Sequence, residues 1–306
     1  MGILFLKKAM ATSILFLILL FNAGCSTVMT HPFPDLDSDL KISVTDKHPN
    51  SNDWDEGSYH LGKTNICFSK AEGEKGANEA QFLFGIIGRA IAVGDKAGSL
   101  KNMIKGEENT FSLDLGSMTR ESLKKELGSA KDTGRFSTDN DWNTAPLQIT
   151  PYAVFSFVDE EKARLWVVLH LEWIDQALKK KKWNCRYIAG LGDPRPLTGK
   201  TGWASNQGNL LQTTVKSDIR LALRIMLDDL QGKLRSEKVP KDNIGAHWMF
   251  HKNPYFADVQ KLKSTDDWDI YLPLVEDEEY FAGINIVPKG FSLPLPMPAK
   301  GKEWGN

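Results

Sequence analysis

Residues 152–174, YAVFSFVDEEKARLWVVLHLEWI, decide the fold of this chain. The runs 152–158 and 163–174 are rich in β-branched and aromatic residues, which predicts two strands. The acidic connection 159–162 is too short for a crossover, so the strands form an antiparallel hairpin. Both alternating sets of the second strand are largely apolar, which is typical of a central strand covered on both faces. These sets are Leu165, Val167, Leu169, Leu171 and Trp173, and Trp166, Val168, His170 and Glu172.

The segments that follow the hairpin supply a third strand and the strongest helix. Residues 183–190 favour a strand, and residues 209–235 have apolar side chains spaced by three and four, which indicates an amphipathic helix. The apolar stripe consists of Val215, Ile219, Ala222, Leu223, Met226, Leu230 and Leu234. Such a stripe requires a sheet to lie on, and the preceding strands supply one.

Residues 78–93, NEAQFLFGIIGRAIAV, predict a second helix that is apolar almost all round. The run is too short to span a bilayer, so a core helix is favoured over one that dips into the membrane. The fold class is therefore α+β, with a mainly antiparallel sheet from strands near 147–190, packed by the amphipathic helix 209–235 and the apolar helix 78–93. Weaker patterns predict strands near 58–68, 109–115, 248–250, 269–274 and 284–287, and a short helix at 119–127.

The first 25 residues have the three parts of an export signal. Lys7 and Lys8 precede the apolar run 9–21, and the small pair Ala23 and Gly24 precedes Cys25. The apolar run has about 13 residues, whereas a helix that crosses the hydrocarbon core needs roughly 20. A cleaved signal peptide is therefore favoured over a permanent transmembrane helix.

The junction at Cys25, preceded by Ala23 and Gly24 and followed by Ser26, resembles the lipobox of bacterial lipoproteins. The resemblance covers only these first residues, and Asn22 stands where the class usually has an aliphatic residue. It implies that Cys25 is the lipidation site: its thiol takes a diacylglycerol, the chain is cut before it, and the new amine is acylated. Ser26, rather than Asp, is the pattern that in this class permits transfer to the outer membrane.

These features divide the chain into four parts. We expect a signal peptide at 1–24, a polar tether at 25–57, an α+β domain at 58–240 and a C-terminal extension at 241–306. The extension ends in a Pro-rich tail, and the sequence leaves open whether it packs on the same domain.

Charge and cysteine content limit the partners and the redox chemistry. Removing residues 1–24 takes Lys7 and Lys8 but no acid from 38 basic and 39 acidic residues, so the mature chain has a net charge near −3. This balance does not favour nucleic acid as a partner. Apart from Cys25, the chain has Cys67 and Cys185, which could form a disulfide in the oxidising periplasm or remain two separate buried thiols.

The catalytic and metal-binding motifs that we considered are incomplete. Gly199–Thr201 resemble the end of a phosphate-binding loop, but Pro194 stands where the first glycine is required. His247 and His251 have the spacing of a zinc helix, but Trp248 replaces the glutamate that would act as general base. The acidic residues from Asp35 to Asp39 lack the glycine of a calcium loop and predict a solvated tether.

His170 and Glu172 share one face of the predicted central strand and could form an acid–base pair, although a histidine satisfied within the sheet is favoured. The sequence therefore indicates a lipoprotein of the bacterial envelope, facing the periplasm, that acts as a binding or scaffold protein without catalysis or cofactor. An immunity protein for a periplasmic toxin is a specific version. Its partners are the bilayer, through acylated Cys25, and an unknown periplasmic protein. The alternative is an envelope hydrolase whose site is not recognisable as a motif.

Overall fold

The structure of this protein is a computed structural model. It describes residues 32–33, 39–45, 59–61, 64–68, 100, 102–129, 136–138, 145–159, 161–175, 180–190, 192–235, 241–246, 248–249, 255–274, 283–291 and 293–294. The expected signal peptide 1–24, the lipidation site Cys25 and the expected helix 78–93 lie outside these residues. Among the described residues, no helix is long and apolar enough to cross a membrane.

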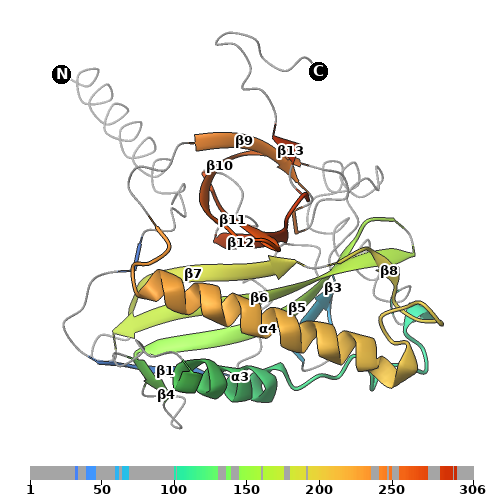
Figure 1. Cartoon of the computed structure of the whole chain (residues 1–306). Coiled ribbons are helices and arrows are strands. Elements are labelled where there is room, and N and C mark those ends of the chain that lie inside the picture. Colours follow the sequence, from blue (N-terminus) through green and yellow to red (C-terminus); the bar gives the residue numbers. More distant parts are fainter. Residues whose placement is uncertain are drawn as a thin grey trace, which may run out of the picture.

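The described strands form one 13-stranded sheet (Figure 1). The strands are β1 (Leu40–Val44), β2 (Tyr59–His60), β3 (Ile66–Phe68), β4 (Phe136–Thr138), β5 (Leu147–Phe157), β6 (Lys162–Asp175), β7 (Lys180–Gly190), β8 (Arg195–Pro196), β9 (Lys241–Ala246), β10 (Tyr255–Ser264), β11 (Trp268–Pro273), β12 (Ile284–Pro288) and β13 (Leu293–Pro294). Their main order is β13-β9-β10-β11-β12-β7-β6-β5-β1-β4, with β3 also beside β5 and β8 beside β6. Most pairs are antiparallel, as predicted, whereas β1–β4, β1–β5, β3–β5 and β12–β7 are parallel.

The predicted hairpin forms the centre of this sheet. β5 and β6 pair antiparallel along their full length, from Leu147 opposite Trp173 to Phe157 opposite Ala163, and β7 pairs antiparallel on the other side of β6. The two faces of β6 are both buried, as its sequence predicts. Leu165, Val167, Leu169 and Leu171 lie in the main core, and Trp166 and Val168 lie in a second cluster on the opposite face.

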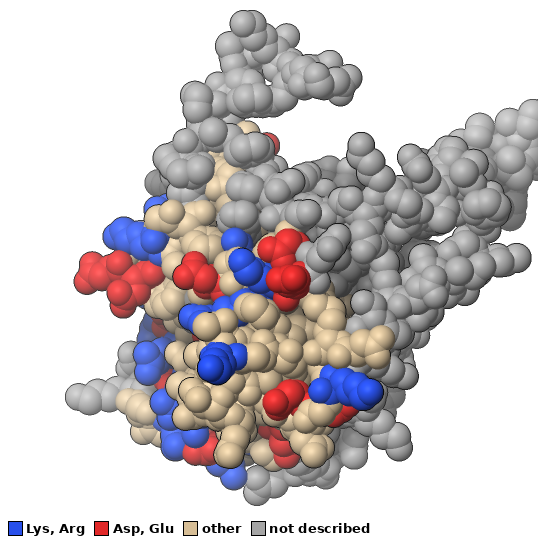
Figure 2. Space-filling model, turned by 90° about the vertical axis from the view of Figure 1, so that its right-hand side faces the viewer, with Lys and Arg blue, Asp and Glu red and all other residues tan. Residues whose placement is uncertain are grey.

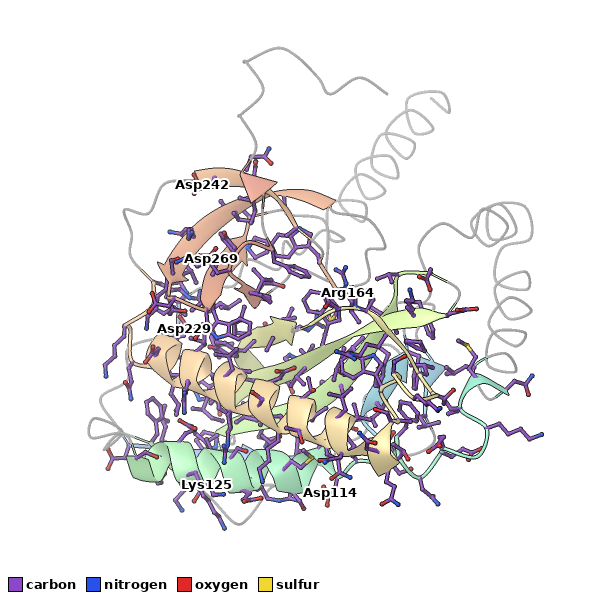
Figure 3. All side chains as sticks on the ribbon, turned by 45° about the vertical axis from the view of Figure 1, so that its right-hand side comes forward. Asp114, Lys125, Arg164, Asp229, Asp242 and Asp269 are labelled. Atoms are coloured by element: carbon purple, nitrogen blue, oxygen red, sulfur yellow. The ribbon has the colours of Figure 1, made fainter. Side chains whose placement is uncertain are left out.

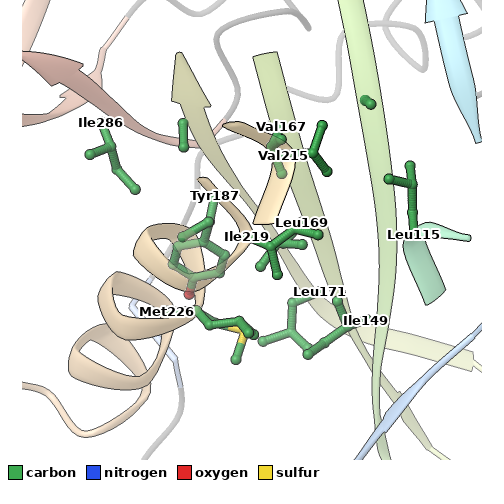
Figure 4. Packing of buried hydrophobic residues seen from close by; sticks show 14 of the residues in the cluster. Leu115, Ile149, Val167, Leu169, Leu171, Tyr187, Val215, Ile219, Met226 and Ile286 are labelled. Atoms are coloured by element: carbon green, nitrogen blue, oxygen red, sulfur yellow. The ribbon is translucent and has the colours of Figure 1, made fainter. Parts of the chain in front are cut away.

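Two helices, α3 (Leu115–Ser129) and α4 (Asn209–Leu230), cover one face of the sheet, which we call the helix face (Figure 1). A short 3₁₀ turn, η1 (Asn206–Gly208), leads into α4. Figure 4 shows Val215, Ile219 and Met226 of α4 packed toward strand residues such as Val167 and Leu169. The predicted helix 209–235 is confirmed, but it ends at Leu230, because a turn with Gly232 in the left-handed region follows.

The predicted strand at Asn109–Leu115 is wrong. Its alternating apolar residues have the pattern of a strand, but the segment forms turns. The ring of Phe111 packs edge-on against Phe68 and Phe155, with ring centroids 6.0 and 5.5 Å apart. Asp114 then caps α3, because its carboxylate accepts hydrogen bonds from the backbone N–H and the hydroxyl of Ser117, at 2.8 and 2.7 Å. These bonds lower the pKa of Asp114.

The expected tether is also wrong over part of its length. Residues Leu40–Val44 form β1, which lies in the sheet between β4 and β5, and Ile42 and Val44 are buried. Phe33 packs edge-on against Trp173 and Trp183, with ring centroids 6.0 and 5.0 Å apart. The alternating apolar residues Leu40, Ile42 and Val44 were visible in the sequence, but the partner strand β5 lies more than 100 residues away.

The described residues after 240 continue the same sheet. β12 pairs in parallel with β7, with Ile284 opposite Tyr187, and β11, β10 and β9 follow antiparallel. Figure 1 shows these strands curving into a roll above β7. The roll has a core of its own, in which Trp248, Val259, Tyr271 and Val287 are buried. The described part of the C-terminal extension is therefore packed on the predicted domain, and strands β9 and β10 were not predicted.

A buried ion pair fastens the end of α4 to β7. Arg235 donates from Nε to Asp229 Oδ1 at 2.7 Å and from Nη2 to Asp229 Oδ2 at 2.8 Å, and the Tyr187 hydroxyl donates to Oδ2 at 2.8 Å. These charge-assisted bonds satisfy a carboxylate that would otherwise be costly to bury. They tie the turn after the helix to the central sheet.

Asp218, near the middle of α4, is also buried, but unlike Asp229 it has no hydrogen-bond partner among the described residues. Its side chain is fully buried, and neither carboxylate oxygen has a hydrogen-bond partner. Burial raises the pKa of Asp218 from its ordinary value of 3.8 to about 8. The carboxyl group is therefore protonated at neutral pH.

This burial makes stability depend on pH. The folded state holds the Asp218 proton up to about pH 8, whereas the unfolded chain releases it near pH 3.8. The free energy of unfolding should therefore fall as pH rises across this window, by up to about 1.4 kcal/mol per pH unit from this group. Denaturant unfolding of Asp218→Asn should show a flatter pH dependence. The control Asp228→Asn, on an exposed part of the same helix, should keep the wild-type slope, and an unchanged slope in Asp218→Asn would contradict the assignment.

Candidate functional site

The side of the sheet opposite the helix face, the second face, carries alternate residues of β5, β6 and β7. Because the strands are in register, these residues form rows that cross the three strands. One half of the second face is apolar and buried. It consists of Cys67, Tyr152, Val154, Trp166, Val168, Ile188 and Met249.

The other half of the second face is polar. One row runs from Thr150 through His170 to Arg186, and the next runs from Gln148 through Glu172 to Asn184. Ser43 of β1 pairs with Gln148 and extends the second row. The polar end of the second face is thus Ser43, Gln148, Thr150, His170, Glu172, Asn184 and Arg186.

The predicted pair His170 and Glu172 lies at the centre of the polar end. His170 Nε2 is 3.9 Å from Glu172 Oε1, and the two side chains are 13% and 23% exposed. The contact is an ion pair only when the imidazole is protonated. Thr150 and Gln148 are buried beside the pair. The polar end therefore places a histidine and a carboxylate among hydroxyl, amide and guanidinium groups at the edge of solvent.

Within the polar end, no serine is hydrogen-bonded to the histidine. An activated serine needs a base within hydrogen-bonding reach, about 2.6–3.2 Å. Ser43, the serine in the rows, has a buried Oγ without a hydrogen-bond partner. The hydroxyl is therefore not paired with His170 or Glu172, although the pair itself could hold or move a proton on a bound group.

Other candidate sites from the sequence are not assembled. Lys200 and Thr201 are exposed on a turn closed by a hydrogen bond from Gly202 N to Gly199 O, at 3.1 Å. A phosphate-binding loop leads straight into its helix, whereas α4 begins only at Asn209. His247 and His251 lie outside the described residues. Within the part that the structure describes, no group of three or more potential metal ligands occurs.

The sequence left open whether Cys67 and Cys185 form a disulfide or remain two separate buried thiols, and the structure has two separate thiols. Cys67 and Cys185 are separate and buried, and no disulfide joins them. Cys67 lies on the second face and Cys185 on the helix face, with β5 and β6 between their strands. Three strand spacings amount to about 14 Å, far beyond the reach of a disulfide. Burial raises the pKa of each thiol to about 12.

Sequence reasoning placed His170 and Glu172 on one face but missed their neighbours. The tight turn after β5 could have identified Thr150 and Gln148 as cross-strand partners. Arg186 could not be aligned in this way, because a register shift in β6 between Trp173 and Ile174 changes its pairing with β7. Ser43 was missed because β1 was expected to be part of the tether.

The fold and the second face define the described chain as a mixed α/β protein with one large, mostly antiparallel sheet and two helices on one side. Comparison with models of known protein families found no match, and comparison with curated proteins found none either.

The state of the two thiols can be tested directly. We expect a thiol reagent to modify neither Cys67 nor Cys185 in the native protein, because both are buried and their pKa values are raised. After unfolding in denaturant without reductant, two thiols should react in the lipidated chain. A count of zero in the unfolded protein would mean that they are paired.

Proposed function

We propose that this chain is a lipid-anchored lipoprotein of the bacterial cell envelope that faces the periplasm and binds a protein partner without catalysis. The observation that carries the proposal is the stretch Met1–Cys25, with its charged start, apolar run and small pair before a cysteine. Acyl chains on Cys25 would anchor the chain stably, because each buried CH₂ adds about 0.8 kcal/mol. Ser26 favours the outer membrane over the inner membrane.

The polar end of the second face is the proposed contact surface. It carries polar side chains, including a carboxylate and a guanidinium group, in two aligned rows, which suits a partner with complementary polar groups. On the separate face of the molecule that Figure 2 shows, basic and acidic side chains are also interspersed. This mixture, like the net charge, favours a protein partner over nucleic acid.

A specific version is an immunity protein that neutralises a toxin arriving in the periplasm. The alternative class, an envelope hydrolase, draws support from the half-buried pair of His170 and Glu172 with its separation of 3.9 Å. The two classes differ in what they require of His170. A hydrolase would lose activity in His170→Gln, whereas a binding surface would tolerate this polar replacement with only weaker binding.

The anchor is tested by metabolic labelling with a fatty acid. Wild-type protein should incorporate label, and Cys25→Ser should incorporate none and should accumulate in its uncut form. Cys67→Ala is the matched control and should label like the wild type, because its thiol is buried in the fold. Mass spectrometry that finds the unmodified chain with residues 1–24 still attached would overturn the anchor.

The immunity version is tested by deletion and complementation. Cells that lack this protein should become sensitive to a toxin encoded beside it, and the wild-type chain should restore resistance. The double variant Glu172→Ala, Arg186→Ala should complement at least tenfold less well, because it removes both charges from the polar end. Glu121→Ala with Lys125→Ala removes an exposed ion pair on α3 and should complement fully. A deletion strain indifferent to the toxin would exclude this version.

A further inference from the structure

Arg164 and Trp166 lie at the opposite end of the second face from the polar end. They are two residues apart on β6, so both side chains leave the strand on the same side. Val154 and Gly190 flank Trp166, and Ser156 lies opposite Arg164. Figure 3 shows Arg164 on the side of the sheet that faces the rolled C-terminal strands.

These two side chains present buried N–H groups that have no acceptor. Trp166 is 1% exposed, and its Nε1 has no hydrogen-bond partner. Arg164 Nε and Nη1 are buried and likewise have none. Indole and guanidinium groups only donate hydrogen bonds, so only an acceptor can satisfy them. Such buried donors are nearly always paired in folded proteins.

The contrast with Trp203, another buried indole, is direct. Trp203, which is as buried as Trp166, donates from Nε1 to the backbone oxygen of Ala163 at 2.9 Å. A backbone oxygen of β6 therefore accepts the hydrogen bond of one buried indole N–H. The unpaired donor of Trp166 belongs to the other face of β6, the face that also carries Arg164 two residues away.

Packing holds both side chains in place. The ring of Trp166 lies against Gly190, where an added Cβ would come within 1.9 Å of Trp166 Cζ3. The guanidinium carbon of Arg164 lies 5.1 Å from the centroid of the Phe291 ring. Packing thus restricts both side chains before any ligand arrives, and Arg164 as a whole residue is only partly buried.

We propose that Arg164 and Trp166 form a binding site for an oxyanion, a carboxylate or phosphate group whose oxygens accept hydrogen bonds from the indole N–H and from the guanidinium. The site is separate from the polar end and does not depend on the lipid anchor. Arginine suits this role because its charge persists when it is partly desolvated. The negative charge of Asp193 acts on Arg164 and competes with the oxyanion.

The experiment follows the indole N–H resonances of the protein by ¹H–¹⁵N NMR during titration with sodium phosphate or sodium acetate, at constant ionic strength set by sodium chloride. The Trp166 resonance, assigned by its loss in Trp166→Phe, should shift and saturate. The Trp203 resonance should stay in place, because its N–H already has an acceptor. Saturation in the phosphate arm or the acetate arm identifies the group that binds.

Two further variants move the affinity in opposite directions. Arg164→Gln should weaken binding at least tenfold, because it removes charge-assisted hydrogen bonds. Asp193→Asn should strengthen binding, because it removes the competing charge; a purely structural role for Arg164 would not produce this gain. Arg164 is partly exposed, so Arg164→Gln remains informative if Trp166→Phe does not fold. A Trp166 resonance that does not move with either anion, or one that moves equally in Arg164→Gln, would overturn the site.

Discussion

Strand β6 must be covered on both faces, and the rest of the structure follows from this requirement. Leu165, Val167 and Leu169 need one apolar layer, and Trp166 and Val168 on the opposite side need another. The helices α3 and α4 satisfy the first need with the stripe that contains Val215, Ile219 and Met226. On the opposite side, apolar residues give way along the strand to the polar rows around His170 and Glu172.

The buried polar groups of this fold fall into two kinds. Asp229 is neutralised by Arg235 and accepts a further hydrogen bond from Tyr187, so its position joins α4 to the sheet. Asp218, on the same helix, has no such partner and stays neutral by keeping its proton. The unpaired donors of Arg164 and Trp166 have no hydrogen-bond partner within the described chain. A change of protonation cannot remove these donors, because the guanidinium and the indole keep their N–H groups at neutral pH.

Local patterns predicted the elements whose partners lie close in the sequence. The hairpin of β5 and β6 and the helix α4 were predicted from alternation and from spacing by three and four. β1 was assigned to the tether, because three alternating apolar residues do not reveal a partner more than 100 residues away, and β9 has too few apolar positions to stand out. The same limit applies to the candidate site: His170 and Glu172 share a strand, whereas Ser43 and Arg186 reach them only through long-range pairing.

The packing of Phe33 against Trp173 and Trp183 has a geometric consequence for any membrane attachment. If the lipid sits on Cys25, only eight peptide units separate it from a side chain held by the sheet. Fully stretched, these units reach about 28 Å, at roughly 3.5 Å each. The folded part would then stay within a thin layer next to the bilayer. A binding partner would have to enter that layer to make contact.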